Sequence, residues 1–293
     1  MSDTPNAEWA ATRELLRELP KSGLHRGIDF DTYARWPAAN FSSLKHFRRS
    51  AAHARYEQTH QSDTSAKVLG QAVHVALLEP ERFAATYVGA PELDRRTVAG
   101  KAAWIAFQGE NADRIVLKAD EMADCLALSR AAQEHPVAGA LLQSAGHREV
   151  SLLWHDADTG LDCKARPDLF VKWDGYSTIV DFKTTRDASP SGFAIECARF
   201  SYHLQAAWYL AGADAISPVA RRFVFVAIEK SPPHCIGIYE LDSADLDAGR
   251  AAIRECLHRY KRARETGEWP GYSTQTQTLR LPAWATQIHE EDT

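Results

Sequence analysis

The chain has 293 residues, of which 45% are hydrophobic and 25% are charged, and its formal net charge is −5. This composition excludes a wholly disordered or fibrous chain and a uniformly basic nucleic-acid coat, although a local basic face would not show in the sum. No apolar run approaches the ~18 residues that a membrane span needs. The five cysteines are widely spaced and no secretory leader is visible, which predicts reduced thiols in a cytoplasmic protein with no membrane partner.

Helical spacing dominates the first half of the chain. Ser42 is a plausible N-cap for a basic helix, and a later helix carries His74 among apolar residues and ends at Pro80. The stretch 91–118 is charged and poorly patterned, and a second helical region is interrupted at Pro136. The predicted helices of this half cover residues 7–19, 42–55, 68–79 and 120–142.

Strand patterns begin at Glu149 and alternate with helices to the end of the chain. The dipeptide Asp174-Gly175 is a two-residue hairpin signal. The order is a three-strand meander, a helix that starts at Pro190, two strands and a long helix. This order predicts an α/β or α+β fold with a mixed central sheet flanked by helices. The predicted strands cover residues 149–155, 161–173, 176–184, 222–229 and 235–241, and the last helix covers 243–266.

The hairpin at Asp174-Gly175 brings acidic residues together. If these two residues form the turn, Asp168 and Asp181 are equally distant from it and lie opposite each other, with Cβ atoms roughly 4.5–5.5 Å apart. Lys183 lies two residues beyond Asp181 and therefore on the same face. A bulge in either strand would shift this register.

Two facing carboxylates cost free energy unless a divalent cation, a shared proton or a base lies between them. Oxygen ligands of this kind suit Mg²⁺ or Mn²⁺, and a lysine beside such an ion can orient a water molecule. The set therefore points to metal-assisted hydrolysis of a phosphodiester. The alternative is a solvated strand face on which Arg166, Asp168, Asp181 and Lys183 form ordinary cross-strand ion pairs.

These residues also match a known nuclease pattern. Pro167-Asp168 followed by Asp181-Phe182-Lys183 has the spacing of a P-D…(D/E)-x-K core. The chain resembles the RecE (exonuclease VIII) type of nuclease in the PD-(D/E)xK superfamily, which also holds λ exonuclease and the RecB nuclease domain. The matching segments occur in the family's order and are 69–74 (LGQAVH), 78–83 (LEPERF), 159–168 (TGLDCKARPD), 181–185 (DFKTT) and 202–209 (YHLQAAWY).

The resemblance implies a restriction-endonuclease-like core and a role for each matching residue. It places the metal on His74, Asp168, Asp181 and the main-chain carbonyl of Phe182, with Glu149 as a further acid that binds through water. Lys183 matches the catalytic lysine. Gln205 and Tyr209 match a Q-x-x-x-Y pair on the helix that follows the core, and their i,i+4 spacing puts them on one side of it.

The resemblance also implies a substrate, partners and domain limits. The substrate is the end of linear double-stranded DNA, digested 5′→3′ with Mg²⁺ to leave a 3′ single strand for recombination. The partners are a RecT-type annealing protein and further copies in a ring-shaped homotetramer. We expect an N-terminal extension over 1–41, the exonuclease domain over 42–268 and an irregular tail over 269–293. Phosphate contacts are expected from Lys45, Arg48, Arg49, Arg55 and Arg166, with the basic end of the last helix as a second candidate.

Three alternatives stay open at this point. One is an endonuclease with the same core. Another is a nuclease of the Cas4/AddB kind, although its cysteine-clamped iron–sulfur cluster has no counterpart among the scattered cysteines. The third is a non-catalytic DNA-binding module with a relic core.

Overall fold

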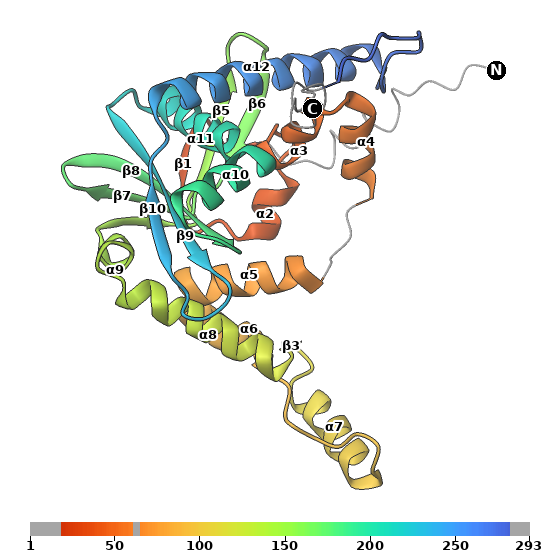
Figure 1. Ribbon diagram of the computed structural model, residues 1–293, viewed down its shortest axis with the longest axis vertical. Helices are drawn as coiled ribbons and strands as arrows, with labels where there is room; N and C mark the ends of the chain where they lie inside the picture. The colour runs from red at the N-terminus through yellow and green to blue at the C-terminus, as the bar shows by residue number, and fades with distance from the viewer. Residues whose placement is uncertain (1–18, 61–64, 282–293) are drawn as a thin grey trace, which may run out of the picture.

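A five-stranded mixed sheet forms the centre of the computed structural model, which describes residues 19–60 and 65–281 (Figure 1). Its strand order is β10-β9-β8-β7-β4, with β8 and β9 parallel and the other neighbours antiparallel. The predicted mixed α/β fold is therefore confirmed. The strands are β4 (Gly146–Arg148), β7 (Leu169–Trp173), β8 (Tyr176–Thr185), β9 (Arg221–Glu229) and β10 (Ile236–Tyr239).

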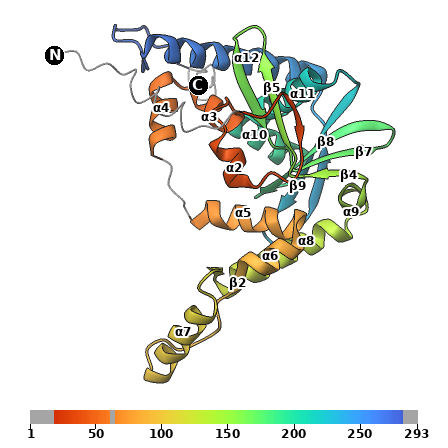
Figure 2. The ribbon, with the colours of Figure 1, turned by 180° about the vertical axis from the view of Figure 1, so that it is seen from behind.

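Two smaller sheets accompany the central one. An antiparallel sheet of order β1-β5-β6 contains β1 (Gly23–His25), β5 (Ser151–Asp156) and β6 (Leu161–Ala165). A short parallel pair joins β2 (Tyr87–Gly89) to β3 (Ile115–Leu117). This pair lies at the base of a projecting arm that ends in helix α7 (Val98–Glu110), as both ribbon views show (Figures 1 and 2).

Helices cover both faces of the central sheet. The first face packs against α5 (Ser65–Leu78), α8 (Ala119–Glu134) and α9 (Pro136–Gln143). The second face packs against α10 (Pro190–Phe200), α11 (Tyr202–Ile216) and α12 (Ser243–Thr266). The remaining helices are α2 (Phe30–Arg35), α3 (Phe41–Leu44), the 3₁₀ helix η1 (Lys45–Arg48), α4 (Ala51–Thr59) and α6 (Pro80–Thr86).

Alternation along β8 sends its side chains into two separate cores. Val180 and Phe182 belong to the core under α5 and α8, whereas Ile179 belongs to the core under α11 and α12. Since successive strand residues point to opposite faces, Asp181 and Lys183 lie on the α11 side. Gly249 lets α12 approach α11 closely, because a Cβ there would lie 2.4 Å from the carbonyl oxygen of His203.

The predicted hairpin register is confirmed. Leu169 pairs with Val180 and Trp173 pairs with Tyr176, so Asp174 and Gly175 form the turn. Asp174 has φ 50° and Gly175 has φ 79°, the left-handed values that favour this type of dipeptide. The register therefore places Asp168 at the end of the ladder opposite Asp181.

The prediction of a single strand over 161–173 is wrong, and with it the three-strand meander. The chain leaves the small sheet after Ala165 and enters the central sheet at Leu169. Pro167 explains the break, because proline has no N–H to continue a ladder. Glu149 was predicted to begin a strand over 149–155, but it lies outside the observed strand: it has φ 49° and precedes β5 by two residues.

Three helix predictions also change. Asn40, and not Ser42, caps α3 by accepting a hydrogen bond from the N–H of Ser43. The helix predicted from Pro190 breaks at Ser201, whose left-handed conformation (φ 64°) separates α10 from α11. The stretch 91–118 contains α7, which Thr97 caps. The helix predicted over 7–19 lies, apart from its last residue, outside the described residues.

Lys164 of β6 anchors the N-terminal segment to the small sheet. Its side chain is 2% exposed. Its Nζ donates to the carbonyl oxygens of Tyr33 at 2.8 Å, Ala34 at 2.9 Å and Trp36 at 2.8 Å. These carbonyls lie at the C-terminal end of α2, where a cation is favoured by the helix dipole. Burial lowers the pKa of Lys164 to about 8, which still leaves the ammonium charged at neutral pH.

We expect Lys164→Met to lower the free energy of unfolding by about 3 kcal/mol, because three carbonyl oxygens lose their buried donor. Urea denaturation followed by circular dichroism measures the loss. The control is Lys172→Met at an exposed position of β7, which should change stability by less than about 0.5 kcal/mol. Equal stability of the two variants would contradict the anchoring role.

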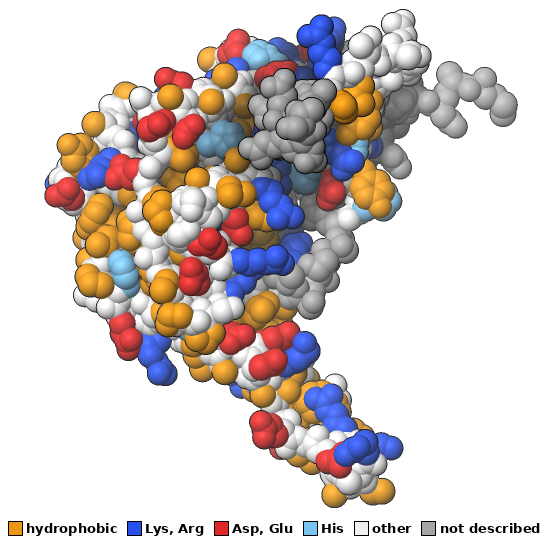
Figure 3. All heavy atoms as spheres, in the orientation of Figure 1, with side chains coloured by type: hydrophobic (Ala, Val, Ile, Leu, Met, Phe, Trp, Pro, Cys, Tyr) orange, Lys and Arg blue, Asp and Glu red, His pale blue; other side chains and the backbone are white. Residues whose placement is uncertain are grey.

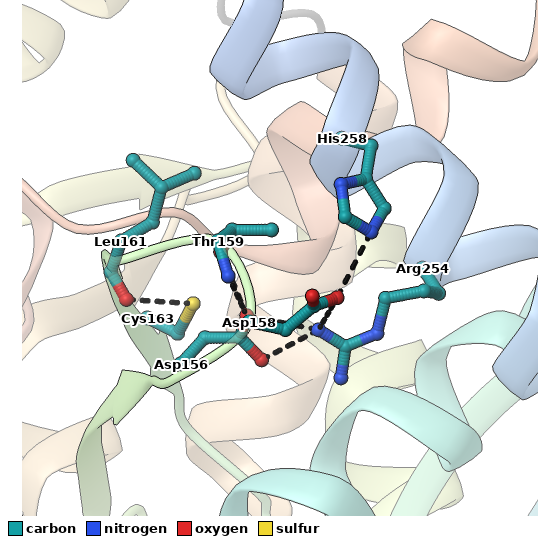
Figure 4. A network of polar contacts seen from close by, with 7 residues as sticks. All are labelled: Asp156, Asp158, Thr159, Leu161, Cys163, Arg254 and His258. Carbon is teal, nitrogen blue, oxygen red and sulfur yellow. Dashed lines mark hydrogen bonds and ion pairs between the residues drawn. The ribbon is translucent and has the colours of Figure 1, made fainter.

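A second network fixes the β5–β6 turn to α12 (Figure 4). Arg254 Nη1 lies 2.7 Å from Asp156 Oδ2, and His258 Nε2 lies 3.0 Å from Asp158 Oδ2. Thr159 donates its backbone N–H to Asp156 Oδ1 at 2.9 Å and closes the turn. The small sheet is thereby held at both ends, by α2 and by α12.

Within the described residues, no helix is long and apolar enough to cross a membrane.

Candidate active site

Three side chains from separate parts of the chain converge beside the end of β7. His74 comes from the middle of α5, Glu149 from the residue pair before β5, and Asp168 from the connection between β6 and β7. One ligand atom from each lies within 4.8 Å of the others. His74 Nδ1 is 3.5 Å from Asp168 Oδ2, and the Glu149 N–H donates to the Asp168 carbonyl oxygen at 2.9 Å. The group is close enough to share one ion.

The charges in this group depend on one another. Burial would lower the pKa of His74, but the Asp168 carboxylate outweighs it and raises that pKa to about 9. Burial would raise the pKa of Asp168, yet His74 and Lys183 hold it below its ordinary value. Burial raises the pKa of Glu149 to about 7, and the Asp168 carboxylate adds to the rise. At neutral pH the imidazolium of His74 thus occupies the place beside the carboxylates, and a metal ion would have to displace its proton.

Asp168 also links the group to β8. Its Oδ2 accepts a hydrogen bond from the N–H of Phe182 at 2.7 Å. Phe182 itself is 2% exposed and packs its ring into the core under α5. The side chain of Asp168 is therefore held by α5 on one side and by the backbone of β8 on the other. The Phe182 carbonyl as a metal ligand stays a prediction.

Asp181, Lys183, Gln205 and Tyr209 form a second group next to the first. Asp181 Oδ2 is 2.5 Å from Lys183 Nζ, and Asp181 Oδ1 accepts from Gln205 Nε2 at 2.8 Å. The same Gln205 nitrogen lies 3.2 Å from the Tyr209 hydroxyl. Asp181 is therefore not one of the three residues whose ligand atoms lie within 4.8 Å of one another, and its role as a metal ligand stays a prediction. Gln205 and Tyr209 do share one side of α11, as their spacing predicted.

Lys183 is charged and its position is fixed. Burial would lower the pKa of Lys183, but the Asp181 carboxylate raises it above its ordinary value. Burial raises the pKa of Asp181 to about 6, although the Lys183 ammonium opposes the rise. The ring of Tyr202 supports the other side of Lys183, with its centroid 4.6 Å from Nζ.

The prediction that Arg166 contacts DNA does not fit its position. Its side chain is 8% exposed, and its Nε lies 2.7 Å from Glu149 Oε2. Its Nη1 donates to the carbonyl oxygen of Ile28 at 2.9 Å and to Ser151 Oγ at 2.8 Å. Arg166 is thus a buried residue that orients Glu149, with few donors left for a phosphate.

The other predicted DNA contacts lie in a separate layer of η1 and α4. Arg48, Arg49 and Arg55 are exposed, whereas Lys45 is half-buried. Burial lowers the pKa of Lys45, and the nearby Lys183 ammonium adds to the lowering, which places η1 beside the second group. Figure 3 shows lysine and arginine side chains gathered toward the edge of the body at which α2, α3 and α4 lie. These positions are compatible with phosphate contacts, which stay a prediction.

Sequence reasoning missed Tyr33, Lys164 and Tyr202. Burial raises the pKa of Tyr33, whose ring centroid is 4.7 Å from Lys164 Nζ and 5.7 Å from the Arg166 guanidinium. The lysine lies inside the matched segment 159–168, so its alternation with Arg166 offered a signal. Tyr202 likewise lies inside the matched segment 202–209, although no role was assigned to it. Tyr33 offered no signal, because its place depends on how α2 packs.

Comparisons with known proteins bear on this arrangement. The family model described as "PDDEXK-like domain of unknown function (DUF3799)" matches residues 40–282. The chain belongs to this family. The match confirms the predicted membership of the PD-(D/E)xK superfamily. The mixed central sheet with flanking helices agrees with that fold. A search of curated proteins finds no significant match.

Solved structures add a likeness in fold. The PDDEXK-like chain is similar to a protein from Eubacterium rectale described as "Putative exonuclease", with a TM-score of 0.59 and 14% identity over 87% of this chain and 95% of that one. A second structure, SSO0001, has a TM-score of 0.29 and 16% identity over 68% of this chain and 88% of that one. At 14% identity, the similarity to the Eubacterium rectale protein is a similarity of fold alone.

Proposed function

We propose that this PDDEXK-like protein is a metal-dependent DNA exonuclease. The observation that carries the proposal is the meeting of His74, Glu149 and Asp168 directly beside the Asp181–Lys183 pair. Such a combination of metal ligands and a fixed lysine suits hydrolysis of a phosphodiester. The "Putative exonuclease" of similar fold lends support to the substrate class.

The residues present fit a hard divalent cation. Two carboxylates and an imidazole offer oxygen and nitrogen donors, and Asp181 adds a third carboxylate at the edge of the group. Burial raises the pKa of both Glu149 and Asp181, and a bound cation would favour their charged forms. We propose Mg²⁺ as the ion, with Mn²⁺ as a substitute. When bound, it supplies Lewis-acid stabilisation of charge on the phosphate.

The chain's own residues divide the remaining work. His74, Glu149, Asp168 and Asp181 would hold the ion, and Arg166 keeps Glu149 in place. Lys183 holds the attacking water or offsets charge that develops on the phosphate. Gln205 fixes Asp181 through its amide, and Tyr209 fixes Gln205, so both are positioning residues.

We further propose 5′→3′ digestion of linear double-stranded DNA that leaves a 3′ single strand for recombination. The resemblance to RecE-type nucleases supports this direction, together with a ring-shaped homotetramer and a RecT-type annealing partner. Light scattering at working concentration tests the ring, and a monomer would overturn it.

The direction has its own test. With a linear duplex labelled at one 5′ end, we expect the label to appear in short products at the earliest times. The same duplex labelled at the 3′ end should retain its label in long single strands. Early release of the 3′ label with retention of the 5′ label would reverse the proposed polarity.

A further inference from the structure

The C-terminal half of α12 and the start of α4 enclose a basic pocket of about 510 Å³. We call it the arginine pocket, because Arg49, Arg259 and Arg262 line it together with Ser50, Thr266 and Glu268. Three guanidinium groups face one carboxylate there, although the whole chain is acidic. Figure 3 shows lysine and arginine side chains over this half of α12. The basic segment that contains Arg49 and the basic end of the last helix, both noted in the sequence, thus meet at this pocket.

Two of the three arginines are held by the protein. Arg259 Nη1 donates to the carbonyl oxygen of Phe47 at 3.0 Å and its other nitrogen pairs with Glu255. Arg49 Nε donates to the hydroxyl of Tyr272 at 3.1 Å. The exposed guanidinium of Arg262 has no hydrogen bond or ion pair to another residue in the part of the chain that the structure describes. The pocket therefore has fixed walls and one uncommitted cation.

Short contacts connect the arginine pocket to the candidate active site. Lys183 Nζ lies 4.6 Å from the ring centroid of Tyr202, and the neighbouring Ser201 Oγ accepts from Arg48 Nη1 at 2.6 Å. Arg49, which follows Arg48, is already a wall of the pocket. A strand that leaves Lys183 along η1 would reach the pocket next.

We infer that the arginine pocket binds phosphodiester groups of a single DNA strand that extends beyond the cleavage site. This inference rests on the proposed nuclease function. It adds a second DNA contact to the one at the candidate active site. Guanidinium groups match phosphate oxygens in a bidentate way, and arginine suits such recognition better than lysine. A volume of this size takes a group on the scale of one nucleotide rather than a duplex. The contact reads the backbone and carries no base specificity.

The test measures binding without cleavage. A short fluorescently labelled single-stranded oligonucleotide is titrated with protein in EDTA at several salt concentrations, and anisotropy gives the affinity. The variants are Arg262→Gln and the control Arg250→Gln, which lies on the same helix outside the pocket and pairs with Asp247 at 2.5 Å. Both remove one positive charge from an exposed side chain. Binding of inorganic phosphate alone is measured in parallel by calorimetry.

We expect Arg262→Gln to weaken oligonucleotide binding about fivefold at ~0.1 M salt and to reduce the salt slope by about 0.7, the amount for one lost phosphate contact. Arg250→Gln should match the parent protein. Equal effects of the two variants would overturn the inference, because net charge alone would then explain them. Inorganic phosphate bound at the pocket with oligonucleotide affinity unchanged in Arg262→Gln would also overturn it, in favour of a free-anion site. A parent protein that cleaves no DNA would count against the proposed function and leave this comparison valid.

Discussion

Lys183→Met is expected to reduce the rate of DNA cleavage about 10²–10⁴-fold. Lys183 Nζ is the one cation within 2.5 Å of Asp181 among the described residues, and methionine keeps most of the side chain's length while removing the charge. The loss should appear in kcat rather than in DNA affinity, because the lysine acts on the water or on charge that develops during the reaction. Initial rates on linear duplex DNA with Mg²⁺ measure the effect.

The control for this variant is Lys230→Met at the exposed position directly after β9. It removes the same charge from the same sheet and should leave the rate unchanged. Circular dichroism should show that both variants keep the parent fold. A Lys183→Met protein that retained more than about a tenth of the parent rate would remove Lys183 from the mechanism.

Asp168→Asn should abolish both metal binding and cleavage while the fold persists. The substitution removes one charge from the group with His74 and Glu149, but the amide oxygen can still accept from the N–H of Phe182. Losing about 4 kcal/mol of charge stabilisation corresponds to about a 10³-fold lower rate. Calorimetric titration with Mn²⁺ reports the ion directly, and cleavage assays report the rate.

Asp162→Asn is the matched control for this second substitution. Asp162 lies on β6 and pairs with His155 at 3.0 Å on an exposed face. The Asp162→Asn variant should bind Mn²⁺ as the parent protein does. Unchanged Mn²⁺ affinity in Asp168→Asn would show that the ion, if bound, uses other residues.

The hairpin shows how far local sequence information reaches. The turn dipeptide Asp174-Gly175 determined the register, and the register placed Asp168 opposite Asp181. The i,i+4 spacing of Gln205 and Tyr209 likewise survives in α11, where one amide nitrogen contacts both Asp181 and Tyr209. In each case the prediction depended on neighbours within one strand pair or one helix turn.

What the sequence did not indicate depends on contacts between distant segments. Arg166 looked like a surface cation, but the Ile28 carbonyl and Ser151 bury it against Glu149. Glu149 looked like a strand residue, although its left-handed backbone turns it toward Asp168. The break at Ser201, which separates α10 from α11, had no glycine or proline to mark it.

The central claim is a metal-dependent exonuclease, and one digestion tests it most directly. Linear double-stranded DNA and a covalently closed circle of the same sequence are incubated with the protein, once with Mg²⁺ and once with EDTA. The account predicts loss of the linear DNA alone, and only with Mg²⁺. Cutting of the circle would contradict it in favour of an endonuclease, and no cutting of either DNA would contradict it in favour of a DNA-binding module without catalysis.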